Sequence, residues 1–208
     1  MKILTKTIKA YTYNELSESA KEKVKQMILN DKTHDQIFYD DIVYFLSKTF
    51  KHSDLKVTYS LGSCQGDGLN IYGTLDLYDF IKLWDTEDKA KRTIKFYCEF
   101  INEYKFFTNN RYCYSCKFLD KKYISDAIDE HIEILEDNQI MNINTALITK
   151  FYNDMIDYFA KLDVQFAKDG YRWFYEIYDD EAQEECEANE YYFNESGDYI
   201  NTFDYVEV

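Results

Sequence analysis

The stretch from Leu55 to Leu77 decides the fold, and it has three parts: LKVTYSL (55–61), GSCQGDG (62–68) and LNIYGTLDL (69–77). The first and third parts alternate apolar and polar residues, which is typical of β-strands with one buried face. The seven residues between them hold three glycines and an aspartate, a composition that favours a tight or bulged loop. We predict a β-hairpin here. The second strand should direct one apolar set to the core: Leu69, Ile71, Leu75 and Leu77.

Segments on either side of this hairpin repeat apolar residues at helical spacing, and Ser17 is placed to cap the first of them. The spacing predicts helices near 16–28, 35–50, 87–105, 121–137, 144–167 and 179–189. Shorter alternating or aromatic runs predict further strands at 3–12, 112–118, 171–178 and 199–206. No Gly/Ser-rich linker or repeat divides the chain. We therefore expect an α+β fold: one domain over residues 1–208, with a small, mostly antiparallel sheet packed with several helices.

Composition places the chain among folded proteins of a reducing compartment. Of its 208 residues, 46% are hydrophobic, which is enough to bury a core. The apolar runs near Met1 are too short for a signal peptide or a membrane span. Five widely spaced cysteines, an odd number, fit reduced thiols better than a disulfide framework. We expect a cytoplasmic protein that does not associate with membranes.

The net charge of −15 is concentrated near one end of the chain. Residues 173–208 hold twelve Asp and Glu and no Lys or Arg, whereas the first 172 residues carry a net charge of only −3. A protein that binds nucleic acid directly needs the opposite field, so we exclude that class.

The segment DDEAQEECEANE (179–190) has helical spacing, with Ala182 and Cys186 as a small inner stripe. A solvated face is the ordinary interpretation of such a helix. Here no cation compensates the carboxylates, and like charges at i,i+4 cost a few tenths of a kcal/mol per pair. We therefore predict a surface for a basic partner, either a protein or a protein–RNA complex. Its candidate residues are Asp179, Asp180, Glu181, Glu184, Glu185, Glu187 and Glu190.

The loop GSCQGDG has two interpretations. Its glycines permit unusual backbone conformations, and Ser63, Gln65 and Asp67 could present polar groups to a partner. The same residues could instead satisfy the loop's own backbone, which the sequence favours more strongly. The loop has neither a P-loop ending nor a dinucleotide-binding fingerprint. Ser63, Gln65 and Asp67 remain candidate partner contacts.

No segment indicates catalysis or a metal site. Cys113 and Cys116 have the spacing of a zinc knuckle, but no second pair of ligands completes a tetrahedral site. His131 has no nucleophile at a recognised spacing, so we expect a hydrogen-bonded core or boundary residue. We predict no catalytic residue, no metal and no cofactor. An enzyme that uses Asp67 as a base near the loop is an alternative that the sequence leaves open.

Three segments together resemble a family of uncharacterised bacteriophage and mobile-element proteins, sometimes labelled antitoxin-like. They are YTYNELSESAKEKV (11–24), YSLGSCQGDGLNIYG (59–73) and EIYDDEAQEECEANEYYFNESG (176–197). Their order and spacing match over nearly the whole chain. Cys64 stands where the family usually has Ser, which argues against a catalytic hydroxyl at that position.

The resemblance implies a phage setting, and small acidic phage proteins are often inhibitors of host defence. We therefore expect an acidic binding protein in the host cytoplasm, of the anti-CRISPR or anti-restriction type. It would mimic nucleic acid on a basic surface of a host complex. An antitoxin-like protein that neutralises a basic toxin would need the same surface and is the first alternative. A small-ligand enzyme that uses the GSCQGDG loop is the second.

Overall fold

The computed structural model describes residues 8–30, 33–62, 67–106 and 121–201. The chain divides into two compact units: unit 1 is Met1–Gln36 with Tyr171–Val208, and unit 2 is Ile37–Gly170. Both divisions fall inside helices, α2 (Thr33–Thr49) and α6 (Thr145–Tyr175). The single domain over residues 1–208 stays a prediction. The two units are defined by where contacts within the chain are dense, whereas a domain is defined by cooperative unfolding.

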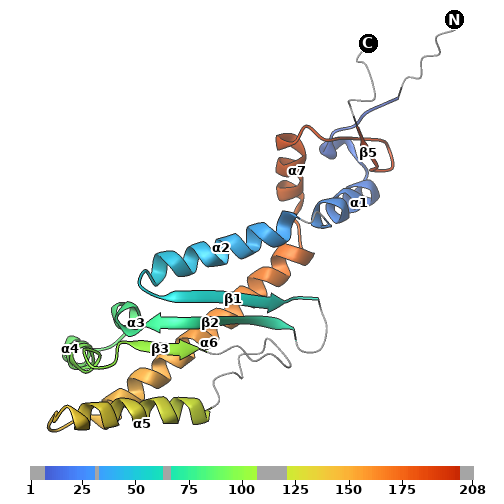
Figure 1. Ribbon diagram of the computed structural model, residues 1–208. Helices are drawn as coiled ribbons and strands as arrows, with labels where there is room; N and C mark the ends of the chain where they lie inside the picture. The colour runs from blue at the N-terminus through green and yellow to red at the C-terminus, as the bar shows by residue number, and fades with distance from the viewer. Residues whose placement is uncertain (1–7, 31–32, 63–66, 107–120, 202–208) are drawn as a thin grey trace, which may run out of the picture. The chain divides into compact units, whose positions relative to one another are not determined.

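Unit 2 is an antiparallel sheet packed with helices, which confirms the α+β class (Figure 1). The three strands lie in the order β1-β2-β3. Besides most of α2 and α6, the unit contains β1 (Asp54–Ser60), β2 (Gly68–Asp76), α3 (Leu77–Leu83), α4 (Asp88–Tyr97), β3 (Glu103–Phe106) and α5 (Lys121–Asp137).

The predicted hairpin is confirmed. β1 and β2 pair in antiparallel register from Asp54 opposite Thr74 to Ser60 opposite Gly68. Gly73 has φ +117°, and a Cβ at this position would lie 2.1 Å from the carbonyl oxygen of Asp54. Only glycine fits where the two backbones approach so closely.

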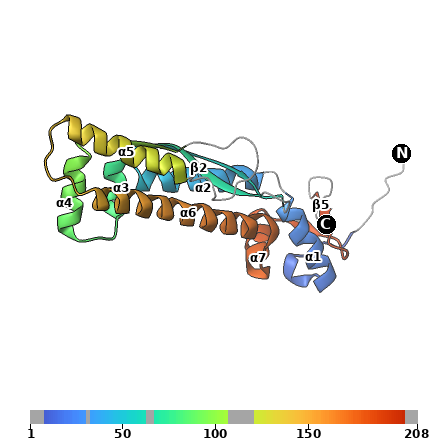
Figure 2. The same ribbon diagram turned by 90° about the horizontal axis from the view of Figure 1, so that it is seen from below.

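The part of α6 that belongs to unit 2 runs along this sheet and packs against it (Figure 2). The Asp163 carboxylate accepts a hydrogen bond from the backbone N–H of Ile71 on β2 (3.0 Å). At Gly170 a Cβ would lie 2.3 Å from Leu61 and 2.7 Å from Phe38, so the helix backbone contacts these side chains directly. Aromatic rings fill much of the remaining core: Phe50, Phe80, Trp84, Phe151, Tyr152 and Phe159.

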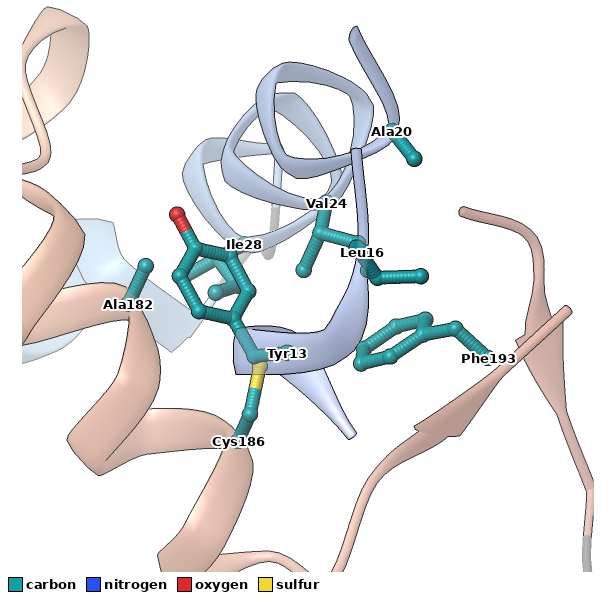
Figure 3. Close-up of a cluster of buried hydrophobic side chains, with 8 residues drawn as sticks. All are labelled: Tyr13, Leu16, Ala20, Val24, Ile28, Ala182, Cys186 and Phe193. Atoms are coloured by element: carbon teal, nitrogen blue, oxygen red, sulfur yellow. The ribbon is translucent and has the colours of Figure 1, made fainter. Parts of the chain in front are cut away.

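Unit 1 is built from the two ends of the sequence. Its elements are η1 (Tyr13–Glu15), α1 (Glu18–Leu29), α7 (Asp179–Ala188) and the short hairpin β4 (Tyr192–Phe193) with β5 (Tyr199–Ile200). Ser17 caps α1, as predicted, by accepting a hydrogen bond from Ala20 N–H (3.4 Å). The core is one cluster, in which α1 and η1 meet α7 and β4 (Figure 3): Tyr13, Leu16, Ala20, Val24, Ile28, Ala182, Cys186 and Phe193.

The predicted strand at 171–178 is wrong. Residues 171–175 form the last part of α6, and residues 176–178 lead into α7. The segment YRWFYEIY is rich in aromatic residues that favour strands, but β-propensity is weak against context. Gly170 lies inside α6 and packs against Leu61 and Phe38. The helix therefore does not end at this glycine, and residues 171–175 continue it.

The predicted helix at 87–105 is too long. Helix α4 ends at Tyr97, a turn follows, and Tyr104 lies in β3 opposite Leu75 of β2. The strand predicted at 69–77 ends one residue early, since Asp76 accepts a hydrogen bond from Tyr78 N–H (2.8 Å) and caps α3, a helix that the sequence analysis missed.

Near the two ends of the chain, only one or two residues of each predicted strand form β-structure. Within the described part of 3–12, Tyr11 makes an isolated bridge to Phe193. Of 199–206, Tyr199 and Ile200 form β5, and the remainder beyond 201 lies outside the described residues. The predicted strand at 112–118 also lies outside them.

Candidate functional site

The acidic helix is present where the sequence placed it, as α7. Ala182 and Cys186 are fully or almost fully buried against the unit 1 core, which fixes the face that α7 turns inward. Because residues four apart lie on one side of a helix, this short stripe leaves the rest of α7 outside the core. Figure 3 shows both side chains directed toward Tyr13.

All seven predicted carboxylates around α7 are exposed, and we call them the α7 acidic surface. They are Asp179, Asp180, Glu181, Glu184, Glu185, Glu187 and Glu190. The first three lie in the first turn, where a negative charge interacts favourably with the helix dipole. Glu181 also accepts a hydrogen bond from Tyr178 N–H (3.0 Å), so it caps the helix.

Two of the seven carboxylates are paired with cations of unit 1. Lys25 on α1 forms an ion pair with Asp179, which also accepts a hydrogen bond from the Tyr13 hydroxyl (3.2 Å). The Lys25 ammonium lowers the pKa of Asp179 below its ordinary value. Arg172 forms an ion pair with Glu181 (3.2 Å). These contacts attach α7 to its own unit.

The other five have no Lys or Arg partner among the residues that the structure describes. Asp180, Glu184 and Glu187 follow one another at i, i+4 and i+7, on the side of α7 opposite the buried stripe. Glu185 accepts a hydrogen bond from Asn189 (2.8 Å), and Glu187 accepts one from Gln183 (2.7 Å), but both partners are neutral. The outer face of α7 is thus a row of uncompensated negative charge.

An open pocket of about 300 Å³ lies beside this surface, between α1 and the link from α6 to α7. One wall is a stripe of α1 that includes Glu22, Lys25 and Leu29, and the other is residues 175–178. The sequence analysis missed this pocket. Residues 22–29 and 175–178 each look unremarkable alone, and no local pattern signals that they lie together.

The hairpin loop gives less support for a partner site. Ser63 and Gln65 lie outside the described residues. Asp67 accepts a hydrogen bond from the Ser60 hydroxyl (3.0 Å), which joins the ends of the two strands. This contact supports the structural interpretation of Asp67 as a residue that closes the hairpin.

His131 is a core residue, as predicted. It is fully buried, with Nδ1 3.1 Å from the Tyr152 hydroxyl and Nε2 3.2 Å from the Tyr97 carbonyl oxygen. A carbonyl can only accept, so Nε2 carries the proton and Nδ1 accepts from Tyr152. Burial lowers the pKa of His131, which keeps the ring neutral. Both ring nitrogens are thus used inside unit 2.

Asp163 is a buried acid that the sequence did not single out. Its exposed fraction is 7%, and burial raises its pKa to about 7, while the bond from Ile71 N–H acts in the opposite direction. An aspartate in a helix is exposed by default, so nothing in the sequence marks this one.

The structure also bears on metal binding and on membrane-spanning helices. Across the described ranges, no group of three or more His, Cys, Asp and Glu side chains could hold a metal ion. Cys113 and Cys116 are not among those residues. Among the described helices, none is long and apolar enough to cross a lipid bilayer.

Comparison with protein-family models found no match, and comparisons with curated proteins and with solved structures found none either. The resemblance to a phage and mobile-element family therefore stays a prediction that rests on the three segments quoted above.

Proposed function

We propose that this protein is a phage-encoded acidic binding protein that inhibits a host defence or nucleic-acid-handling complex by occluding a basic surface. The observation that carries the proposal is the outer face of α7, where exposed carboxylates have no cation partner among the described residues. The acid–cation pairs of unit 1 hold α7 in place and leave this face available.

The density of charge on α7 fits a groove made for nucleic acid. Helix α7 has ten residues and carries six carboxylates, of which two are paired. At a rise of about 1.5 Å per residue, the three of these on the outer side, Asp180, Glu184 and Glu187, follow one another at roughly 6 and 4.5 Å along the axis. A nucleic-acid strand carries one charge per about 3.4 Å. A row of Lys and Arg that binds phosphates would therefore meet carboxylates at a spacing of the same order.

The test is inhibition of purified restriction and CRISPR nucleases on a DNA substrate, with wild type and the triple variant Glu184→Lys/Glu185→Lys/Glu187→Lys. Wild type should inhibit at least one nuclease, and the inhibition should weaken more than tenfold between low and physiological salt, since Lys/Arg contacts to charged partners are screened. The triple variant should lose inhibition, because it replaces attraction by repulsion.

Helix α5 of unit 2 supplies a control with an equal change of charge, since Asp129, Glu133 and Glu136 are three exposed carboxylates on one helix. Reversing these three to Lys makes the same change in net charge and should leave inhibition intact. Full potency of the α7 variant, or inhibition that ignores salt, would refute the proposal. Neutralisation of a toxin encoded beside this gene, without inhibition of any nuclease, would instead assign the antitoxin role.

A further inference from the structure

We infer that the pocket between α1 and residues 175–178 binds an arginine side chain of the basic partner. This inference rests on the proposed function and adds a specific anchor to it. A charged row gives attraction without orientation, whereas a pocket that selects one kind of side chain fixes the register of the complex.

The walls of the pocket suit a long side chain with an apolar stem. Leu29 and Ile177 are half-buried and line it, and Tyr175 and Tyr178 are about half exposed (50% and 53%). The Tyr175 ring stacks on Tyr171 and Arg172 lies over the Tyr178 ring, so the parts of the two residues that stay exposed are the ones that can contact methylene groups and a cation. The stem of a Lys or Arg would cover apolar surface while its head reaches the rim.

The charges at the rim favour a cation over an anion. Lys25 lines the pocket, but its ammonium is already paired with Asp179. Glu22 and Glu176 line it too, and Glu22 accepts only a hydrogen bond from the neutral Gln26 (3.2 Å). Glu176 has no hydrogen bond or ion pair from its carboxylate within the described part of the chain. Two carboxylates are thus available against no free ammonium.

The same unit already binds a guanidinium in this manner. Arg172 lies over the ring of Tyr178, 5.3 Å from its centre, and donates to Glu181 (3.2 Å). A planar guanidinium can stack on a ring and at the same time donate to a carboxylate, which a strongly hydrated ammonium does less well. Tyr175, whose ring also stacks on Tyr171, and Glu176 supply a second aromatic residue and a second carboxylate to the pocket lining. This combination selects arginine rather than lysine.

The experiment compares two synthetic peptides of equal length and charge, one a Gly-Arg repeat and the other a Gly-Lys repeat. Their binding to the full chain is measured by titration calorimetry. Wild type should bind the Arg peptide about threefold to tenfold more tightly. Glu176→Gln and Tyr175→Leu should each bring the ratio of the two dissociation constants close to one. The control Glu195→Gln removes the same charge from an exposed position outside the pocket lining, and it should leave the ratio unchanged.

The outcomes separate this inference from the function on which it rests. If both peptides bind with equal affinity, the arginine pocket is refuted while the acidic surface stands. If neither peptide binds, both proposals fail. If Glu195→Gln removes the preference as strongly as Glu176→Gln does, the selectivity belongs to the acidic segment as a whole and the pocket is again refuted. Circular dichroism and the melting temperature of each variant establish that it is folded.

Discussion

The two units of the chain use their polar residues in opposite ways. Unit 1 holds 8 basic and 17 acidic residues, a net charge of −9, and unit 2 holds 16 and 22, a net charge of −6 over a longer stretch. The buried polar side chains identified in the described residues all belong to unit 2: Asn70, Asp79, His131 and Asp163. In unit 1 the described charges lie at the surface. Polar residues of unit 2 should therefore govern stability, and those of unit 1 should govern binding.

The largest losses of stability are expected from substitutions of glycines, one in each unit. Gly73→Ala in unit 2 would place a Cβ 2.1 Å from a backbone oxygen at φ +117°, and backbone cannot move aside as a side chain can. We expect a loss of about 3 kcal/mol or more from strain and overpacking. Gly197→Ala in unit 1, at φ +80° with a Cβ 2.6 Å from the Ala20 oxygen, should cost about 1–3 kcal/mol.

Thermal unfolding of these two variants also tests the single domain predicted from the sequence. If the chain is one cooperative domain, both variants lower the midpoint of one transition. Calorimetry and circular dichroism should then give the same midpoint for each variant. If each variant instead lowers one of two separate transitions, the units are independent domains and the prediction of a single domain is wrong.

The second effect concerns Asp163, inside unit 2. Its folded pKa of about 7 lies above the unfolded value of 3.8, so the folded state binds the proton more tightly. The carboxyl therefore costs stability as the pH rises from about 4 through 7. Asp163→Asn keeps an acceptor for Ile71 N–H without the charge. It should be neutral near pH 4 and stabilising by about 2–4 kcal/mol above pH 7, at about 1.4 kcal/mol per pKa unit.

This prediction is checked by urea unfolding of wild type and Asp163→Asn at a series of pH values. The two proteins must be compared at each pH, because a second buried group also makes stability depend on pH. Burial lowers the pKa of His131, so this residue makes the protein less stable as the pH falls below 6.5. The exposed Asp157 on the same helix is the control, and Asp157→Asn should change little at any pH. A destabilised Asp163→Asn at pH 8 would contradict the expectation.

Local signals in the sequence predicted the parts of the fold that local forces decide. The alternation and the glycine-rich loop between residues 55 and 77 specify a hairpin without help from the rest of the chain. The acidic helix was also predictable, since its inner stripe and its charges lie within one short segment. The same signals located six of the helices and left errors at their ends, but they missed the short helix α3.

Contacts between distant segments decide what the sequence could not show. Residues 171–175 have the composition of a strand, yet they extend a helix whose course is set by the packing of Gly170 on Phe38 and Leu61. Tyr104 fits a helical repeat, yet it pairs in the sheet opposite Leu75. The pocket joins residues of α1 to residues near 175, about 150 positions later. A single sequence holds no record of such pairings.

The smallest predicted change in stability belongs to unit 1. It is a gain, whereas most substitutions lower stability. Asp180, Glu184 and Glu187 repel one another at i,i+4 and i,i+3, so the double variant Glu184→Gln/Glu187→Gln should stabilise the protein by a few tenths of a kcal/mol. The gain should appear as a raised urea midpoint at low salt and disappear at about 1 M salt, where the screening length falls to about 3 Å.

Glu18→Gln is the control for this last effect, because Glu18 lies in the first turn of α1 in the same unit and is paired with Lys21 (3.3 Å). Its neutralisation removes a favourable charge and should destabilise the protein slightly. Opposite signs for the two variants would show that the α7 carboxylates are kept at a cost to folding, as a binding surface requires. If Glu184→Gln/Glu187→Gln were destabilising instead, these carboxylates would serve the fold of unit 1, and the proposed function would lose its main support.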